Sequence, residues 1–413
     1  MTAGIYLNAG SYGPLPAEVR AAMSEIETQE LATGRAAEHV MDDVQQRVDE
    51  LRGAFAGTLA TDLDLVAIGH STTESILRAV AGIRWSPGDR IVTFDEEYPA
   101  IRGSLASFAA HRGLMVQTIS LRDAAGRTRS NEEVLTELLP ALNTPTRLLL
   151  FSAVSWISGR VLPLREMLDA ARERGVISVV DGAQWIGARR DDIDRLDPDW
   201  LAFPSQKWLL GVEGIAGVRI SRRALEGGSF VPLTSGFLGF QTPALDGRGE
   251  RWGDARAHQL SGFSRPNLVG AARAAGWLSM QVGLPWAVER SQRLAEAFSA
   301  AVRPIPGVEL LAPPGSHATI VSLRVANWEA EQLVQELGRR AFAITRHVPA
   351  LPSGDGAPAS AAALRTSWGF WNSDAEVARI AALIELFAQH TPSTLPPRPT
   401  LEILHESDRA ADA

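Results

Sequence analysis

Lys207 is the only lysine in this 413-residue chain, and arginine supplies every other strongly basic side chain. Most surface lysines can be exchanged for arginines at little cost, but arginine stays protonated, whereas a buried lysine can lose its proton and attack a carbonyl carbon. A single retained lysine therefore indicates a position where a neutral amine is required. The count alone equally allows the chance survival of one exposed lysine, so the surroundings of Lys207 have to decide between the two.

Three predicted strands end in polar residues of complementary kinds. One ends in a carboxylate and an amide, another in the lone lysine with a serine and a glutamine, and a third leads into a helix that begins with threonines. Ligands of open α/β sheets bind outside the carboxyl ends of the strands. Pyridoxal phosphate needs a lysine that forms an imine, an acid beside its ring nitrogen and a helix N-terminus for its phosphate. The residues concerned are Asp181, Gln184, Ser205, Gln206, Lys207, Thr72 and Thr73.

Short β-branched runs alternate with amphipathic stretches from about residue 63 onward. This alternation predicts a largely parallel sheet with helices on both faces, and hence one large α/β domain. A helix is predicted between Pro163 and Gly175, because proline favours the first turn of a helix and glycine the position after its end. The predicted strands are LVAIG, IVTF, LMVQTISL, RLLLFSAV, VISVVDG, DWLAFPS and GIAGVRIS.

The pattern changes after residues 266–283, which predict one long helix. HATIVSLRV, AFAITRHV and ALRTSWGF predict strands, WEAEQLVQELGRR and DAEVARIAALIELFAQ predict helices, and LPSGDGAPASAA predicts a mobile loop. Together these elements predict a smaller α+β domain. We expect an N-terminal segment that contributes to the site, a large domain, a small domain and a tail, at residues 1–15, 16–265, 266–395 and 396–413.

The composition excludes several classes of function. The net charge of -8 and the pI near 5.6 disfavour a nucleic-acid partner. The absence of cysteine excludes disulfides, thiolate metal sites and cysteine nucleophiles, and the eight histidines show no metal-ligand spacing, so no metal site is expected. The chain starts without a secretory signal and contains no apolar run that could span a membrane. We therefore expect a cytoplasmic protein without a membrane partner.

Eight motifs, in the same order along nearly the whole chain, resemble the class V aminotransferase family. This family belongs to the fold-type I enzymes that use pyridoxal phosphate and includes cysteine desulfurases and isopenicillin-N-epimerase-like proteins. DGAQ followed by SQKW is the most specific part of the resemblance. The motifs are YLNAGSYGPLP, HSTTES, DEEYPA, AVSWISGRVLPL, VVDGAQ, FPSQKW, SGFSRPN and LRTSWGFWNSDAEV.

The resemblance implies roles for the residues that hold the cofactor. Lys207 would bind it as an imine and later move the α-proton of the substrate. Asp181 would pair with the protonated ring nitrogen, Gln184 would hydrogen-bond the phenolic oxygen, and Tyr98 would stack on the ring. The phosphate would be held by Thr72, Thr73, Ser205 and Gln206. Ordinary alternatives remain open, since Thr72 and Thr73 also suit a helix N-terminus and Tyr98 a hydrophobic core.

The resemblance also implies where an amino-acid substrate binds. Arg365 would clamp its α-carboxylate through a bidentate fork, with Asn8 and Trp156 on the same side. Arg346 and His347 lie near that side in the motif order, although a solvated strand end explains them equally well. Ser264 resembles a residue that reaches the phosphate in a partner subunit, which predicts a homodimer with shared active sites.

Departures from the family pattern bear on the reaction. Trp156 stands where many relatives have Asn or His, and Gln206 where many have His. The loop after His347 lacks the cysteine on which desulfurases form a persulfide.

Three hypotheses survive. The first is a C–S lyase that eliminates a thiolate from an S-substituted cysteine. The second is an aminotransferase, epimerase or decarboxylating deaminase, and the third is a non-catalytic protein that binds the cofactor. Lys207, Asp181 and Arg365 weigh against the third, and the missing cysteine leads us to predict the lyase, with a place in secondary metabolism such as antibiotic biosynthesis.

Overall fold

The seven predicted strands form one sheet. They are β1 (Val66–Gly69), β2 (Arg90–Phe94), β3 (Met115–Ile119), β4 (Thr146–Ser152), β5 (Ile177–Asp181), β6 (Trp200–Pro204) and β7 (Ala216–Ile220). Their order is β1-β7-β6-β5-β4-β2-β3. The strands from β3 to β6 in this order are parallel, and β7 is antiparallel to both of its neighbours. The prediction of a seven-stranded, mostly parallel α/β sheet is confirmed.

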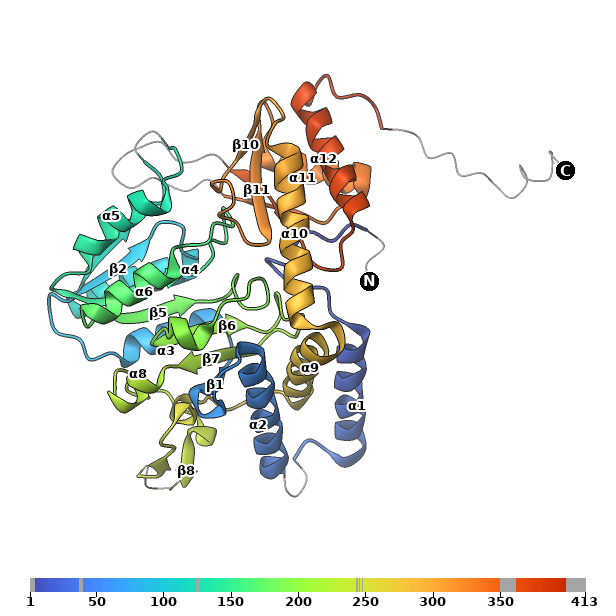
Figure 1. Ribbon diagram of the computed structural model, residues 1–413. Helices are drawn as coiled ribbons and strands as arrows, with labels where there is room; N and C mark the ends of the chain where they lie inside the picture. Colours follow the sequence, from blue (N-terminus) through green and yellow to red (C-terminus); the bar gives the residue numbers. More distant parts are fainter. Residues whose placement is uncertain are drawn as a thin grey trace.

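The structure is a computed structural model. It describes residues 4–36, 40–123, 126–242, 244, 246, 248–349 and 362–398. The segment predicted as a mobile loop falls almost wholly on 350–361, and most of the predicted tail falls on 399–413, so both lie outside the described residues. Figure 1 shows the large domain beside the smaller one, with one long helix running between them.

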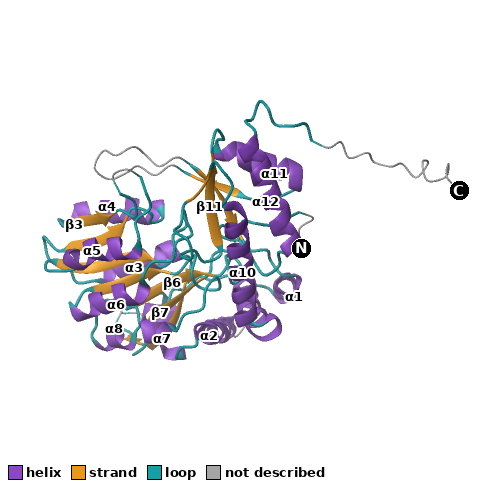
Figure 2. Cartoon of the chain, turned by 45° about the horizontal axis from the view of Figure 1, so that its top comes forward, coloured by secondary structure: helices purple, strands orange, loops and turns teal. Residues whose placement is uncertain are grey.

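Both faces of the large sheet are covered because its central strands are apolar at successive positions. In β4, Leu149 and Phe151 join a core with the helices on one face, whereas Leu148 and Leu150 join a second core with those on the other. The first face carries α2 (Val40–Leu59), α5 (Asn131–Ala141), α6 (Leu164–Glu173) and α7 (Ile193–Leu196), and the second α3 (Thr72–Gly82), α4 (Pro99–Arg112) and α8 (Arg222–Glu226). Figure 2 shows this layered arrangement.

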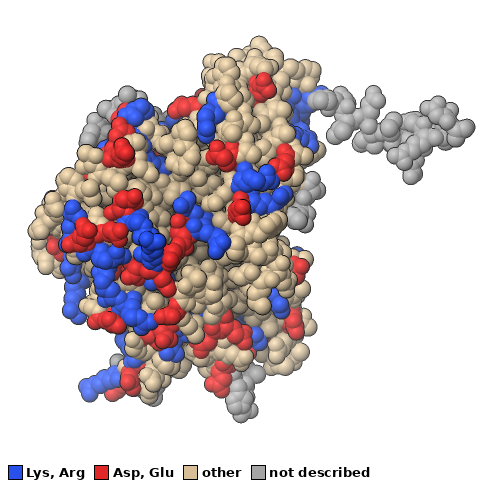
Figure 3. Space-filling view, viewed as in Figure 1, with Lys and Arg blue, Asp and Glu red and all other residues tan. Residues whose placement is uncertain are grey.

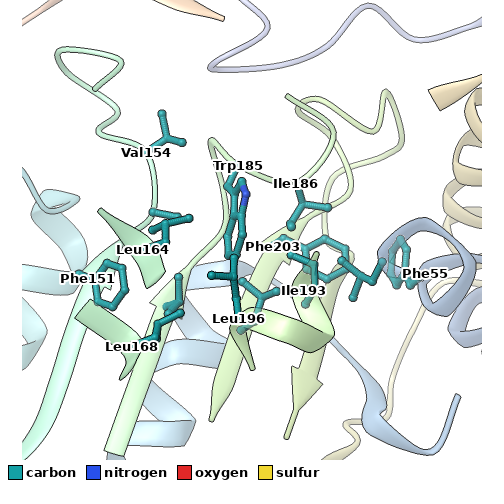
Figure 4. Packing of buried hydrophobic residues seen from close by; sticks show 14 of the residues in the cluster. Phe55, Phe151, Val154, Leu164, Leu168, Trp185, Ile186, Ile193, Leu196 and Phe203 are labelled. Atoms are coloured by element: carbon teal, nitrogen blue, oxygen red, sulfur yellow. The ribbon is translucent and has the colours of Figure 1, made fainter. Parts of the chain in front are cut away.

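Aromatic side chains fill much of the first core. Phe55 of α2 meets Phe203 of β6 edge to face, with ring centroids 5.2 Å apart, and the fully buried Trp185 belongs to the same core (Figure 4). Such edge-to-face pairs add to the stabilisation from area burial alone. The core therefore fixes β5 and β6, whose ends carry the predicted site residues, against a rigid support.

The predicted helix between Pro163 and Gly175 is confirmed as α6. Pro163 precedes its first residue, and Gly175 follows its end with φ at 66°, a conformation that glycine adopts without a steric cost. The helix α1 (Ala17–Thr33) and the helix α2, in contrast, lie in a part of the sequence for which we predicted no elements.

The small domain contains a four-stranded antiparallel sheet in the order β10-β11-β13-β12. Its strands are β10 (Val308–Leu310), β11 (Ile320–Val325), β12 (Arg346–Val348) and β13 (Ala363–Ser367), and its helices α10 (Leu284–Val302), α11 (Ala330–Ala341) and α12 (Asp374–Gln389). The three predicted strands and two predicted helices are confirmed, whereas β10 and α10 were not predicted. A short hairpin, β8 (Phe240–Thr242) with β9 (Glu250–Arg251), belongs to neither sheet.

The single long helix predicted at 266–283 is wrong in detail. It consists of α9 (Arg265–Gly276) followed by a π-helical segment (Trp277–Val282), and α10 begins after Gly283, whose φ is 86°. The helix α9 packs against α1 and α2, so its apolar side chains join the core of the large sheet. Leu294 and Phe298 of α10 belong to the core of the small domain, which also includes Ile5 and Leu7 of the N-terminal segment. The predicted domain limits stay a prediction.

The outer surface shows no single-sign patch on the face drawn in Figure 3, where acidic and basic residues are interspersed. Among the described helices, none combines the length and the apolar character needed to cross a bilayer.

Candidate active site

A cavity of about 210 Å³ lies at the carboxyl ends of β4, β5 and β6, where the large domain meets β12 and β13 of the small domain. Nine of the predicted site residues line it: Thr72, Thr73, Tyr98, Trp156, Asp181, Gln184, Gln206, Lys207 and Arg365. Three others, Asn8, Ser205 and Ser264, are not among its lining residues. Residues that sequence reasoning missed also line it, among them Gly10, Ser11, Tyr12 and Ser152.

Lys207 and Asp181 come from neighbouring parallel strands. Asp181 is the last residue of β5 and pairs with Ala202 of β6, and Lys207 follows the end of β6. Burial lowers the pKa of Lys207 to about 8, against the opposing effect of the Asp181 charge, and the positive charges of Arg365 and Arg346 lower it further. Burial also raises the pKa of Asp181, although Lys207 and the Ala183 N–H counteract it.

Gln184 is held in place at both ends of its amide group. Its side-chain NH₂ donates to the carbonyl of Gly10 at 2.9 Å, and its side-chain oxygen accepts from the indole N–H of Trp208 at 2.9 Å. The amide oxygen is therefore occupied, and one N–H of the NH₂ group remains to donate to a ligand. This orientation is compatible with the predicted bond to a phenolic oxygen, which stays a prediction.

The N-terminus of α3 forms one wall of the cavity. Ser71 caps the helix by accepting from the Glu74 N–H, so Thr72 and Thr73 occupy its first turn. The Thr72 hydroxyl is buried and has no hydrogen-bond partner among the described residues. Free N–H groups and an unpartnered hydroxyl at a helix N-terminus suit a phosphate group.

Ser205 is not among the residues that line the cavity, although its neighbours Pro204 and Gln206 are. The turn after β6 folds back, with the Gly211 N–H donating to the Ser205 carbonyl, and any side chain at Gly211 would collide with Ser205 Oγ. Ser205 is fully buried, and its hydroxyl has no hydrogen-bond partner among the described residues. Its predicted contact with phosphate stays a prediction.

Tyr98 and Trp156 both line the cavity and lie edge to face, with ring centroids 5.7 Å apart and planes at 81°. Tyr98 precedes α4 and is 44% exposed, whereas Trp156 is almost fully buried. The exposed position of Tyr98 argues against the alternative that it is a core residue. Its predicted stacking on a cofactor ring stays a prediction.

Arg365 of β13 is buried and held by three acceptors. It donates to the carbonyl of Trp156 at 3.0 Å, to Oδ1 of Asn8 at 3.2 Å and to Oγ of Ser11 at 3.0 Å. Burial and the charge of Arg346 lower its pKa to about 9. Asn8 thus acts on the cavity through Arg365. Gly10 leaves room for this packing, because a Cβ there would lie only 3.2 Å from the guanidinium carbon of Arg365.

Glu97 is a buried acid that sequence reasoning missed. Its two carboxylate oxygens each accept a hydrogen bond from Ser152, one from the backbone N–H and one from the hydroxyl, both at 2.6 Å. Ser152 lines the cavity and pairs with Asp181 across β4 and β5. Burial raises the pKa of Glu97 to about 8, and the charges of Asp181 and Glu96 raise it further. The run of three acids before Tyr98 was the signal available in the sequence.

The Glu97→Gln variant is expected to gain stability relative to the wild type as the pH rises. The unfolded chain releases the Glu97 proton near pH 4.5, whereas the folded protein keeps it until about pH 8. Within that interval the wild type loses up to about 1.4 kcal/mol of stability per pH unit through this group, and glutamine cannot ionise. Unfolding midpoints of both proteins between pH 5 and 9 measure the difference. Parallel curves for the two proteins, like those expected for the exposed-site control Glu166→Gln, would contradict this assignment.

The described residues fit pyridoxal 5′-phosphate. Lys207 presents an amine whose pKa is lowered by burial, and Asp181 has one carboxylate oxygen that no hydrogen bond within the described part of the chain reaches. The N-terminus of α3 offers the unpartnered Thr72 hydroxyl. An amine, a deep carboxylate and a phosphate-binding helix end thus converge on one cavity.

Known proteins resemble the chain over nearly its whole length. It is 29% identical to the isopenicillin N epimerase of Amycolatopsis lactamdurans, covering 92% of this chain and 94% of that protein. It is 24% identical to a probable cysteine desulfurase of Methanothermobacter thermautotrophicus, over 84% of this chain and 85% of that protein. A solved complex of the cystine C–S lyase C-DES with its reaction product cysteine persulfide superposes on the structure with a TM-score of 0.82. The superposition covers 95% of this chain and 99% of that one at 24% sequence identity, and it establishes the fold.

The sequence pattern of the family described as Aminotransferase class-V matches residues 5–380, which include the large domain's sheet, most of the small domain and every residue that lines the cavity. The predicted family, its fold-type I architecture and its cofactor are thereby confirmed. The chain belongs to the class V aminotransferases, which depend on pyridoxal 5′-phosphate.

Proposed function

We propose that the protein is a C–S lyase that eliminates a thiolate from the β-carbon of an S-substituted cysteine. The observation that carries this proposal is a cavity with one amine base, Lys207, in a chain without any thiol. Without a cysteine the protein cannot take up sulfur as a persulfide on its own side chain. The substrate and water would give a thiol, pyruvate and ammonium, because the enamine left by the elimination hydrolyses spontaneously.

Each residue of the cavity has a distinct task in this reaction. Arg365 holds the α-carboxylate and so orients the α-hydrogen toward Lys207, whose Nζ takes the proton. Pyridoxal phosphate, when bound, supplies a ring system that stabilises negative charge at the α-carbon. Asp181 stabilises the positive charge on the ring nitrogen of the bound cofactor. Tyr98 and Trp156 shield the reacting atoms from water.

Epimerisation at the α-carbon is the second candidate, favoured by the 29% identity to an isopenicillin N epimerase. It would need a second group to return a proton on the face opposite Lys207. Tyr12 and Tyr98 are the phenols among the described residues that line the cavity. Lyase and epimerase thus share the removal of the proton by Lys207 and differ in the fate of the β-substituent.

A panel of S-substituted L-cysteines and ordinary L-amino acids, incubated with the holoenzyme in D₂O, separates these reactions. Pyruvate, measured with lactate dehydrogenase, together with the free thiol supports the lyase. A deuterated D-amino acid without pyruvate would replace it by the epimerase, and an oxo acid or carbon dioxide by a transaminase or decarboxylating deaminase. The absence of every product and of α-deuteration would leave a non-catalytic binding protein.

The pH dependence of cofactor uptake should follow the ionisation of Lys207. Only the neutral amine attacks an aldehyde, and the pKa of Lys207 is lowered to about 8. We expect the rate at which the apoprotein takes up pyridoxal phosphate to rise about tenfold per pH unit below pH 8 and to level off above it. Stopped-flow absorbance measures this rate. An inflection near pH 10, as for an exposed lysine, would contradict the expected environment.

We also propose that the chain works as a homodimer in which Ser264 reaches the partner's cofactor site. Ser264 precedes α9, makes no capping bond with its side chain and does not line its own cavity. Large apolar side chains are exposed on the same molecule, including Tyr12 at 51% and Met280 at 86%. Light scattering should give twice the chain mass of 44.4 kDa, and a monomer with full activity would refute the proposal.

A further inference from the structure

Two arginines face the same cavity from adjacent positions of one sheet. Arg346 in β12 and Arg365 in β13 are direct partners in the antiparallel register, so their side chains lie on the same face. Both line the cavity. Arg365 is buried, whereas Arg346 is exposed to solvent.

One hydroxyl holds the two guanidinium groups together. Ser11 Oγ accepts from Arg346 at 3.1 Å and from Arg365 at 3.0 Å, and it donates to Asn8 Oδ1 at 2.9 Å. No carboxylate in the described part of the chain forms an ion pair with either arginine, and Asp181, the only carboxylate among the described lining residues, lies beside Lys207. The positive charge of Arg346 acts within the cavity, since it lowers the pKa of Arg365 and of Lys207.

The α-carboxylate of one substrate molecule does not balance the positive charges of both Arg346 and Arg365. A carboxylate has two oxygens and is satisfied by one guanidinium fork, which Arg365 supplies from its buried position. The guanidinium of Arg346 lies 5.9 Å from the Trp156 ring, whose other neighbour is Tyr98. Arg346 and Tyr98 thus both lie next to the Trp156 ring, and both are exposed, so they mark the solvent-facing side of the cavity.

We propose that Arg346, with the Trp156 ring beside it, binds a second carboxylate at the end of the substrate's side chain, so that the substrate is an acidic S-conjugate of cysteine. This inference rests on the proposed function and names the substrate class of the same site. Arg346 is thus a specificity-determining residue, and Ser11 positions it relative to Arg365.

Paired ligands that differ only in the distal charge test the inference. S-carboxymethyl-L-cysteine is compared with its carboxamide for kcat/KM of pyruvate formation, and L-glutamate with L-glutamine for binding, measured by the absorbance change of the bound cofactor. We expect the wild type to prefer the carboxylate about tenfold or more in each pair. Arg346→Gln should bring the preference close to one, whereas Arg339→Gln, an exposed arginine of α11, should leave it unchanged.

The outcomes separate this inference from the proposed lyase. A binding preference that depends on Arg346 without any pyruvate would support the subsite and refute the lyase. Pyruvate formation with no preference in the wild type would support the lyase and refute the subsite. An equal loss for both members of each pair in Arg346→Gln would also refute it, because Arg346 would then share the α-carboxylate with Arg365.

Discussion

Replacing Lys207 with alanine should abolish covalent attachment of the cofactor and lower turnover by about a hundredfold to ten-thousandfold, the range for loss of a positioned base. No other side-chain amine exists in the chain. Borohydride reduction of the wild-type holoprotein should leave a pyridoxyl mass on the peptide that contains Lys207. The same treatment of Lys207→Ala should give no such adduct.

Lys207→Arg is the matched control for this experiment. It keeps a positive charge near Asp181, but arginine cannot lose its proton at ordinary pH, so it should be as inactive as alanine while preserving more of the folded stability. A pyridoxyl adduct on the chain's N-terminal amine in the wild type, or turnover by Lys207→Ala close to that of the wild type, would show that Lys207 is not the attachment site.

Replacing Arg365 with lysine should weaken substrate binding by roughly 10- to 100-fold, the loss expected when a charge-assisted pair of hydrogen bonds is reduced to one point charge. The absorbance of the bound cofactor should stay as in the wild type, since lysine keeps the positive charge that Arg365 exerts on Lys207. Titration of that absorbance with substrate gives the dissociation constants.

Arg324→Lys provides the comparison for Arg365→Lys. Arg324 lies on β11 in the same small-domain sheet, and its partner is Glu309 at the surface. It should bind substrate as the wild type does. If Arg365→Lys lost the cofactor but kept its substrate affinity, Arg365 would be a structural residue that supports Trp156 and Asn8.

The strands and the deep part of the site could be predicted because local sequence determines them. Runs such as RLLLFS are apolar at successive positions only where a strand is covered on both faces, and the carboxyl ends of parallel strands meet at one edge. Asp181 is the last residue of such a strand, and Lys207 and Thr72 each come three residues after one. Their convergence in one cavity therefore needed no knowledge of distant contacts.

The remaining parts depend on contacts that the local sequence does not encode. The helix α1 buries only Val19, Ala22 and Ile26 and begins after Pro16 without a side-chain cap, so it lacks a clear start signal and a continuous apolar face. The pairing of Arg346 with Arg365 arises from the register of β12 and β13. Glu97 likewise acquires its partner Ser152 only when the turn after β2 folds over β4.

The N-terminal segment connects the two domains through the cavity itself. Leu7 exchanges backbone hydrogen bonds with Ile344 and Ser367 of the small domain, whereas the Gly13 N–H donates to the carbonyl of Gln206 in the large one. Ser11 lies between these two anchors and bonds both arginines. A ligand that binds the arginines would therefore also restrain the segment that joins the domains, and by reciprocity a change in the relative position of the domains would alter the affinity for that ligand.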